Sequence, residues 1–276
     1  NALYREGPSD PEVGVALFTT ADLQTRAALL HHTSHPVHWN PHTAIHGDWP
    51  GAWAQAVRQH LLPGAIPLVL NGCCGNVIHH DALNPHREDT PDSMAQLLTE
   101  AVRSALTQPC IRQDQPRLAY QTRRFDIPFR AFPKKIFEEA HAFLAAHPDP
   151  KWTNAEHTRF EWDWHFAASL VDLEAFLASH RAFEYEIQAI RVGDLALLVL
   201  PGEPFVEAQL EIKQRSPARR TFVAHMSNRY VGYIPTPAAI GRGGYETRPS
   251  SASKLAPEAL QMITDHSVDL LKKLYA

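Results

Sequence analysis

Short apolar runs and amphipathic repeats follow one another along this chain. Apolar runs between turn residues predict β-strands at residues 13–18, 26–32, 66–70, 118–127, 184–190, 195–200 and 222–226. Apolar positions at helical spacing predict helices at residues 52–62, 92–107, 136–146, 166–180 and 257–274. Because hairpins and helices mix irregularly, we expect an α/β (α+β) fold, a mixed β-sheet with flanking helices in a single domain.

Composition and charge narrow the classes of partner. The 276 residues carry a formal net charge of −4 and no basic stripe, so we expect no nucleic-acid partner. The longest apolar run is far shorter than the roughly 20 residues that cross a bilayer, so we expect no transmembrane segment. Three cysteines, two of them adjacent, fit neither a disulfide framework nor a zinc-finger spacing. The 17 histidines favour a metal site without locating it.

Polar groups follow two of the predicted strands. The run at residues 195–200 leads into Pro-Gly-Glu-Pro-Phe, which contains Glu203, and the run at residues 222–226 leads into Asn-Arg-Tyr-Val-Gly-Tyr-Ile-Pro, which contains Tyr233. Groups just past buried strands stand where α/β proteins bind ligands. The pattern alone favours the simpler interpretation, two strands that have polar ends.

Two further strand ends carry candidate groups. His35 follows one strand and precedes a proline, a position at a sheet edge where a structural histidine is the more common case. The strand at residues 66–70 leads into Asn-Gly-Cys-Cys-Gly-Asn, whose glycines, including Gly75, allow backbone N–H groups to approach a ligand. Asp48, two residues before a proline, is predicted to cap a helix rather than to act in catalysis.

Four motifs, taken in order, resemble one known family. They are Asp-Pro-Glu-Val-Gly-Val at residues 10–15, the His-Pro-Val to Gly-Asp-Trp-Pro-Gly segment at 35–51, the glycine loop at 71–76, and the block from Leu-Pro-Gly-Glu-Pro-Phe through Asn-x-Tyr-x-Gly-Tyr-Ile-Pro-Thr-Pro to Gly-Gly-Tyr-Glu at 200–246. This order and spacing resemble the catalytic domain of the neutral (non-lysosomal) ceramidases, weakly through residues 118–180. The resemblance implies that residues 1–276 form the C-terminal larger part of such a zinc hydrolase domain.

The resemblance also implies a Zn²⁺ cofactor and its ligands. In the family two histidines, a glutamate and a tyrosine hold the ion, and the matching motif positions here are His35, Glu203 and Tyr233. Nitrogen and oxygen ligands suit zinc. The expected catalytic residues are Tyr233, Gly75 and Asn76. Tyr233 would act as a ligand or as a hydrogen-bond donor to the oxyanion, and Gly75 and Asn76 lie in the glycine loop.

One ligand of the family has no counterpart in this chain. The resemblance places the first zinc histidine in a His-x-His segment upstream of the matching region, so we expect a missing N-terminal segment or a companion chain to supply it. The nearest replacements within the chain are His38, His79 and His80. Without that ligand we expect the chain to bind zinc poorly.

The function implied is that of a zinc-dependent amidohydrolase. Metal-activated water would cleave an amide (N-acyl) or ester bond in a small-molecule or lipid-like substrate. Ile78 occupies the position of a serine that ceramidases carry after the glycine loop, which leaves the substrate open between ceramide and another compound. Two alternatives stay open, a non-catalytic binding protein that retains the fold and pocket, and a thiol route through Cys73 or Cys74. The compartment is also open; the resemblance is compatible with a secreted or periplasmic protein.

Overall fold

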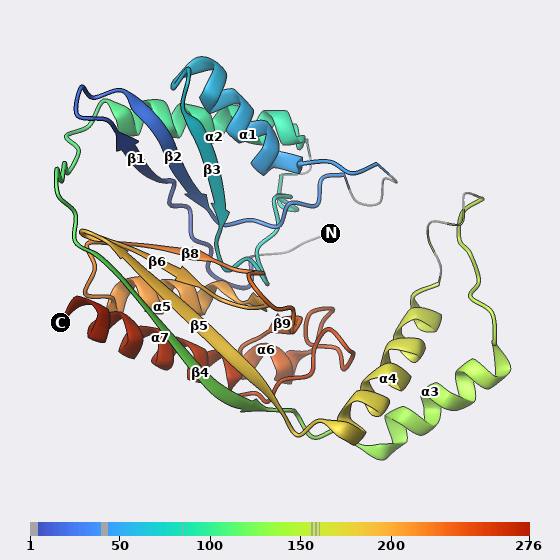
Figure 1. Cartoon of the computed structure of the whole chain (residues 1–276). Helices are drawn as coiled ribbons and strands as arrows, with labels where there is room; N and C mark the ends of the chain where they lie inside the picture. The colour runs from blue at the N-terminus through green and yellow to red at the C-terminus, as the bar shows by residue number, and fades with distance from the viewer. Residues whose placement is uncertain (1–4, 40–43, 85, 156, 158, 160) are drawn as a thin grey trace.

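The computed structural model describes residues 5–39, 44–84, 86–155, 157, 159 and 161–276. It confirms a mixed α/β single domain with helices on mixed sheets (Figure 1). The strands are β1 (Gly14–Thr19), β2 (Thr25–His32), β3 (Ile66–Asn71), β4 (Leu118–Pro128), β5 (Ala182–Val192), β6 (Leu195–Val199), β7 (Glu203–Pro204), β8 (Arg220–Ala224) and β9 (Tyr233–Ile234). The helices are α1 (Asp48–His60), α2 (Pro91–Leu106), α3 (Lys134–Ala146), α4 (Trp162–Ser179), α5 (Val206–Arg215), α6 (Pro237–Arg242) and α7 (Ala259–Tyr275).

The first layer is the three-stranded sheet β1-β2-β3 with helices α1 and α2. β1 and β2 form the expected antiparallel hairpin, and β3 pairs with β2 in parallel. Buried apolar side chains join the sheet to the two helices, namely Ala28, Leu30, Trp49, Trp53, Val57, Ala95, Leu98 and Val102. Such burial stabilises the layer because it removes large apolar surfaces from water. None of the helices in the described part of the chain is long and apolar enough to span a membrane.

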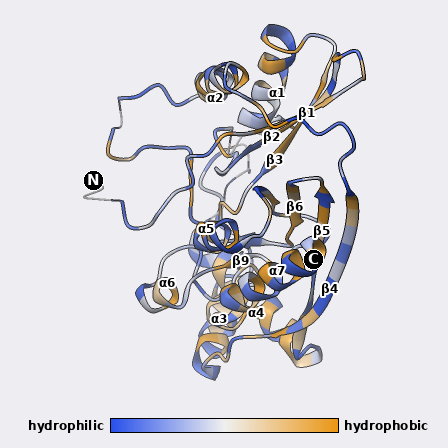
Figure 2. Ribbon diagram, turned by 90° about the vertical axis from the view of Figure 1, so that its left-hand side faces the viewer, coloured by the Kyte–Doolittle hydropathy of each residue, from blue (hydrophilic) through white to orange (hydrophobic). Residues whose placement is uncertain are grey.

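The second layer is the four-stranded sheet β4-β5-β6-β8, on which α5 and α7 pack. Along β4, exposed residues alternate with more buried ones, as the pleat of a half-buried strand requires. Hydropathy follows this alternation only near the end of the strand, where Phe125 and Ile127 are the more buried residues and Arg124 and Asp126 are exposed; the strand as a whole carries hydrophilic and hydrophobic positions (Figure 2). The larger core lies between this sheet and the two helices and includes Ile187, Leu198, Ile212, Ile263 and Leu271. Helices α3 and α4 pack against each other as a hairpin that projects from the ends of β4 and β5 (Figure 1).

The two layers meet where β8 lies against β2 and β3. The buried ring of His31 stacks on Phe222 with centroids 5.0 Å apart, and its Nε2 lies 3.1 Å from the carbonyl oxygen of Val223. Gly14 leaves the room for this contact, since a Cβ there would stand 2.4 Å from the Phe222 ring. Within each parallel pair, β2–β3 and β6–β8, the carboxyl ends point the same way, and the two pairs meet through Asn71 and the segment after β8.

A buried hydrogen-bond network ties α5 to the first layer. Gln209 is fully buried, and its Nε2 donates to Asp10 Oδ2 (2.6 Å) and to Thr33 Oγ1 (2.7 Å). Its Oε1 accepts from the backbone N–H of Cys73 (2.8 Å), while Lys213 Nζ donates to Asp10 Oδ2 (2.6 Å). We expect Gln209→Leu to lower the free energy of unfolding by about 2–4 kcal/mol, because it leaves a buried N–H and a buried carboxylate short of partners.

Urea unfolding measures this loss, with the exposed Gln108→Leu as the control. Burial would raise the pKa of Asp10, but hydrogen bonds from Lys213 and Gln209 and the lysine charge lower it overall. A carboxyl whose pKa is lower in the folded state stabilises the fold above its unfolded pKa, about 3.9, and this stability is lost as the pH falls through the folded value. The difference between wild type and Gln209→Leu should therefore shrink in acid. A difference under about 1 kcal/mol at neutral pH would contradict the role given to the network.

Candidate functional site

His35 lies just past β2 and is oriented by the segment that follows β3. Its backbone N–H donates to the carbonyl oxygen of Val77 (2.9 Å), and its Nδ1 lies 3.2 Å from the same oxygen. A β-bridge to Ile78 adds to this contact. Because Nδ1–H donates to the carbonyl, Nε2 is the atom that faces the site, where it lies 2.9 Å from Oε2 of Glu203.

Glu203 is buried in the two-residue strand β7, which pairs in parallel with β9, so that Glu203 lies beside Tyr233. Its Oε1 accepts a hydrogen bond from the hydroxyl of Tyr230 (3.0 Å), and its Oε2 faces His35. Burial would raise the pKa of Glu203, but His35 and Tyr230 lower it. The carboxylate is therefore ionised at neutral pH and held at both oxygens.

Tyr233 completes the group. Its ring centroid lies 6.2 Å from that of His35 and 5.9 Å from that of Tyr245. Burial raises the pKa of Tyr233 well above its usual value, and the negative charge of Glu203 raises it further. The structure thus brings together His35, Glu203 and Tyr233, which the motifs place far apart in the sequence, and in the metal-free chain Tyr233 is a neutral phenol.

Gly75 and Asn76 lie next to these residues but are engaged in structural contacts. Gly75 N–H donates to the carbonyl oxygen of Pro204 (3.0 Å), and a Cβ at Gly75 would stand 2.4 Å from the carbonyl oxygen of Glu203. Asn76 Oδ1 accepts from the N–H of Val206 (2.8 Å) at the start of α5, and its Nδ2 donates to Glu207. These contacts hold the glycine loop against β7 and α5; a catalytic role for either residue stays a prediction.

The sequence did not single out His225, which follows β8 and lies beside Cys74. The Sγ of Cys74 lies 3.4 Å from Nε2 of His225. Burial would raise the pKa of Cys74, but His225 and His35 lower it to about 7. Burial would likewise lower the pKa of His35, but Cys74 and Glu203 raise it to about 10. Cys73 differs, since burial in the core raises the pKa of its thiol.

A cavity of about 540 Å³ adjoins the site through Tyr230. Its lining combines apolar side chains such as Leu173 and Phe176 with the charged side chains of Arg229, Lys254, Asp172 and Glu184. The ammonium group of Lys254 donates to the carbonyl oxygen of Val231 (3.0 Å), and burial lowers its pKa to about 8. The cavity therefore offers an apolar surface with charged groups of both signs beside Glu203.

The donor atoms at this site fit a zinc ion. A histidine nitrogen and a carboxylate oxygen face each other at 2.9 Å, and a movement of about 0.5 Å would bring them to the roughly 3.4 Å that separates two ligands with bonds of about 2.1 Å to tetrahedral zinc. The histidines expected as replacements for the missing ligand, His38, His79 and His80, lie around Asp89 instead.

Comparison with known proteins shows the fold. Neither a family model nor a curated protein matches the chain. The solved structures that are similar include the neutral ceramidase from Pseudomonas aeruginosa, with a TM-score of 0.63 and 16% sequence identity, covering 95% of this chain and 46% of that one. They also include a ceramidase complexed with C2, with a TM-score of 0.62 and 15% sequence identity, covering 95% of this chain and 48% of that one. The chain thus has a ceramidase-like fold and spans less than half the length of these proteins.

Proposed function

We propose that this chain is the C-terminal larger part of a zinc-dependent hydrolase domain that cleaves an N-acyl amide or an ester. The observation that carries the proposal is the partly buried pair of His35 Nε2 and Glu203 Oε2, 2.9 Å apart at the carboxyl ends of the strands and beside Tyr233. Similarity to structures described as ceramidases supports the reaction class. The substrate class that follows is a lipid-like or small N-acyl compound.

In this proposal His35 and Glu203 hold the ion, and a group from outside residues 1–276 fills a further place. Zinc in such a site polarises a carbonyl and lowers the pKa of water to about 7. Tyr230 fixes the glutamate, since its hydroxyl donates to the oxygen that does not face His35. Tyr233, kept neutral by burial and by Glu203, donates a hydrogen bond to the substrate oxygen that gains negative charge. The adjoining cavity receives the apolar part of the substrate.

A thiol hydrolase is the second candidate, because the pKa of Cys74 is lowered to about 7 beside His225. A nucleophile must reach the substrate carbonyl, and the side chain of Cys74 is fully buried. This burial favours the metal route. The alternative from another class is a binding protein that keeps the fold and the cavity without turnover.

A panel of N-acyl amides and esters separates these functions when it is tested with zinc-loaded residues 1–276 together with the segment or companion chain that supplies the outside ligand. We expect removal of zinc with a chelator to abolish turnover and added zinc to restore it. Iodoacetamide should alkylate the exposed Cys110 while turnover continues, because Cys73 and Cys74 are buried. Cys110→Ser is the matched control and should turn over substrate at the wild-type rate with or without iodoacetamide.

The opposite pattern, inactivation by iodoacetamide in Cys110→Ser and no effect of the chelator, would replace the metal route by the thiol route. Stoichiometric zinc and saturable ligand binding without turnover on any member of the panel would support the binding protein.

A further inference from the structure

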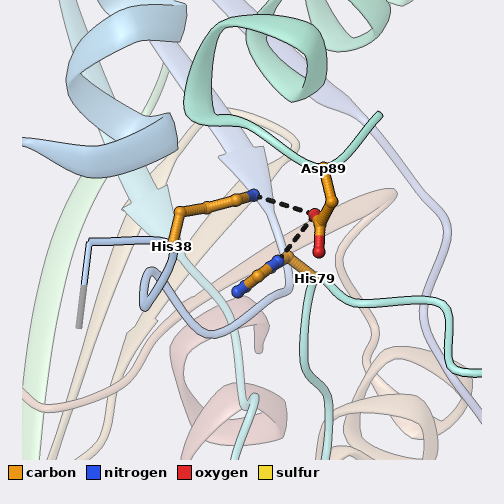
Figure 3. Close-up of side chains that lie close together, drawn as sticks. All are labelled: His38, His79 and Asp89. Carbon is orange, nitrogen blue, oxygen red and sulfur yellow. Dashed lines mark hydrogen bonds and ion pairs between the residues drawn. The ribbon is translucent and has the colours of Figure 1, made fainter. Parts of the chain in front are cut away.

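A second group of metal-ligating side chains lies outside the site just described. His38, His79 and Asp89 converge from three segments, the loop after β2, the segment after the glycine loop and the approach to α2 (Figure 3). One ligand atom from each residue lies within 4.8 Å of the others. The cluster is close in sequence to the first site, because His79 follows Ile78, the bridge partner of His35.

The orientation of His38 is fixed from behind by a carboxylate. Its Nδ1 lies 2.7 Å from Oδ1 of Asp48, a buried residue at the start of α1. The prediction that Asp48 caps this helix is wrong, because the N-cap is Gly47 and no side chain in the described part of the chain caps the helix. Asp48 also accepts hydrogen bonds from the backbone N–H groups of Trp49 (2.7 Å) and Trp39 (3.2 Å). Because the carboxylate of Asp48 accepts a hydrogen bond from Nδ1–H, Nε2 is the ring nitrogen of His38 that is left to act as a ligand.

The other ring nitrogen of His38, Nε2, faces a second carboxylate. The Nε2 atom of His38 is buried, and among the described residues it has no hydrogen-bond partner. The side chain of His38 is 2% exposed, and its Nε2 lies 3.3 Å from Oδ1 of Asp89. A lone pair and a carboxylate oxygen repel each other unless a cation lies between them. Their separation of 3.3 Å is close to the roughly 3.4 Å expected for two ligands with bonds of about 2.1 Å to tetrahedral zinc.

Two more imidazole nitrogens adjoin the same carboxylate. The Nδ1 of His79 lies 2.8 Å from Oδ1 of Asp89, and the ring of His79 stacks on that of His38 with centroids 3.5 Å apart. The side chain of His80 is half-exposed, and its Nδ1 lies 2.9 Å from Oδ2 of Asp89. A set of imidazoles with one carboxylate favours zinc or another first-row divalent metal over magnesium or calcium, which prefer oxygen ligands.

We propose that His38, His79 and Asp89 bind a divalent transition-metal ion, best matched by zinc, at a second site with His80 or solvent in the fourth position. The carboxylate of Asp48 behind His38 supplies the outer hydrogen bond that metal-binding histidines commonly make. The ion would join the loop after β2, which also carries His35, to the segment before α2. The proposal does not depend on the hydrolase function, since it uses none of the first site's residues.

The zinc content per chain tests the proposal. The full chain is first freed of metal with a chelator, then incubated with excess zinc and separated from unbound ion by gel filtration. We expect Asp89→Asn and His79→Gln each to hold one zinc ion fewer than wild type. Asp81→Asn is the matched control, because it removes a carboxylate from the same segment that contacts Arg5 and not the cluster, and it should keep the wild-type content. Zinc should also raise the melting temperature of Glu203→Gln, and fail to do so when Asp89→Asn is added.

The outcomes distinguish the two sites. If Asp89→Asn and His79→Gln keep the wild-type zinc content, or if wild type takes up no zinc, the second site does not exist and the contact between His38 and Asp89 is structural only. If Asp89→Asn loses one ion and Glu203→Gln loses none, the second site stands and the zinc site of the proposed hydrolase fails. If each variant loses one ion, both sites stand.

Discussion

Glu203→Gln is expected to remove zinc from the first site and to lower turnover on the best substrate of the N-acyl panel on the order of 10³-fold. Metal polarisation of a carbonyl contributes several kcal/mol to transition-state stabilisation, and each 1.4 kcal/mol is a factor of ten in rate. Glutamine has nearly the same shape and can still accept the hydrogen bond from Tyr230. The substitution therefore removes the charge that faces His35 and leaves the packing of β7 in place.

Zinc content, melting temperature and turnover of the same preparation measure this effect. Glu138→Gln, which changes an exposed glutamate on α3, is the matched control and should equal wild type in all three. A Glu203→Gln variant that keeps full zinc content and turns over substrate within about tenfold of wild type would remove Glu203 from the site. If the wild-type protein is itself inactive and the folded Glu203→Gln variant only loses zinc, the result supports the binding protein instead.

Periodicity predicted the elements whose burial is regular. The strands β1 to β6 and β8 and the helices α1, α2 and α7 lie within a few residues of their expected positions, because their apolar side chains face a core at the period of the element. Helix α5 was missed, since the buried amide of Gln209 interrupts its apolar face. Strands β7 and β9 are two residues long each, too short for any periodicity to show.

The candidate site was only partly accessible from the sequence. The rule that ligands bind past strand ends indicated an edge, and the resemblance to ceramidases selected His35, Glu203 and Tyr233. Neither could show that Tyr230, three residues before Tyr233 in the same motif, is the tyrosine that donates to Glu203. That choice depends on where β9 begins, which the parallel pairing of β7 with β9 determines.

Contacts that join loops were the least predictable. Cys74 and His225 are 151 residues apart, and only the meeting of β3 with β8 places the thiol beside the imidazole. Asp89 lies in a polar stretch before α2 that has no pattern of its own, yet three histidines gather around it. Seventeen histidines indicated a metal site, but the pairing of ligands depends on tertiary structure.

Tyr233→Phe is expected to lower kcat by about 10²–10³-fold while zinc content stays at the wild-type level, because the change removes one hydrogen-bond donor aimed at a developing negative charge. The raised pKa of Tyr233 is the reason, since a phenol beside the ionised Glu203 keeps its proton and serves as a donor rather than as an anionic ligand.

The two roles open for Tyr233 differ in a single measurement, metal content. If Tyr233 is a phenolate ligand, phenylalanine removes a bond to the ion, and zinc content or affinity must fall together with kcat. If it is a donor, zinc affinity is unchanged and the loss appears in kcat. Tyr120→Phe removes an exposed hydroxyl on β4 and should change neither quantity. Because Tyr233 pairs with Glu203 through the backbone of β7 and β9, the substitution leaves the position of the glutamate intact, so a fall in zinc content would report a lost ligand bond and not a displaced carboxylate.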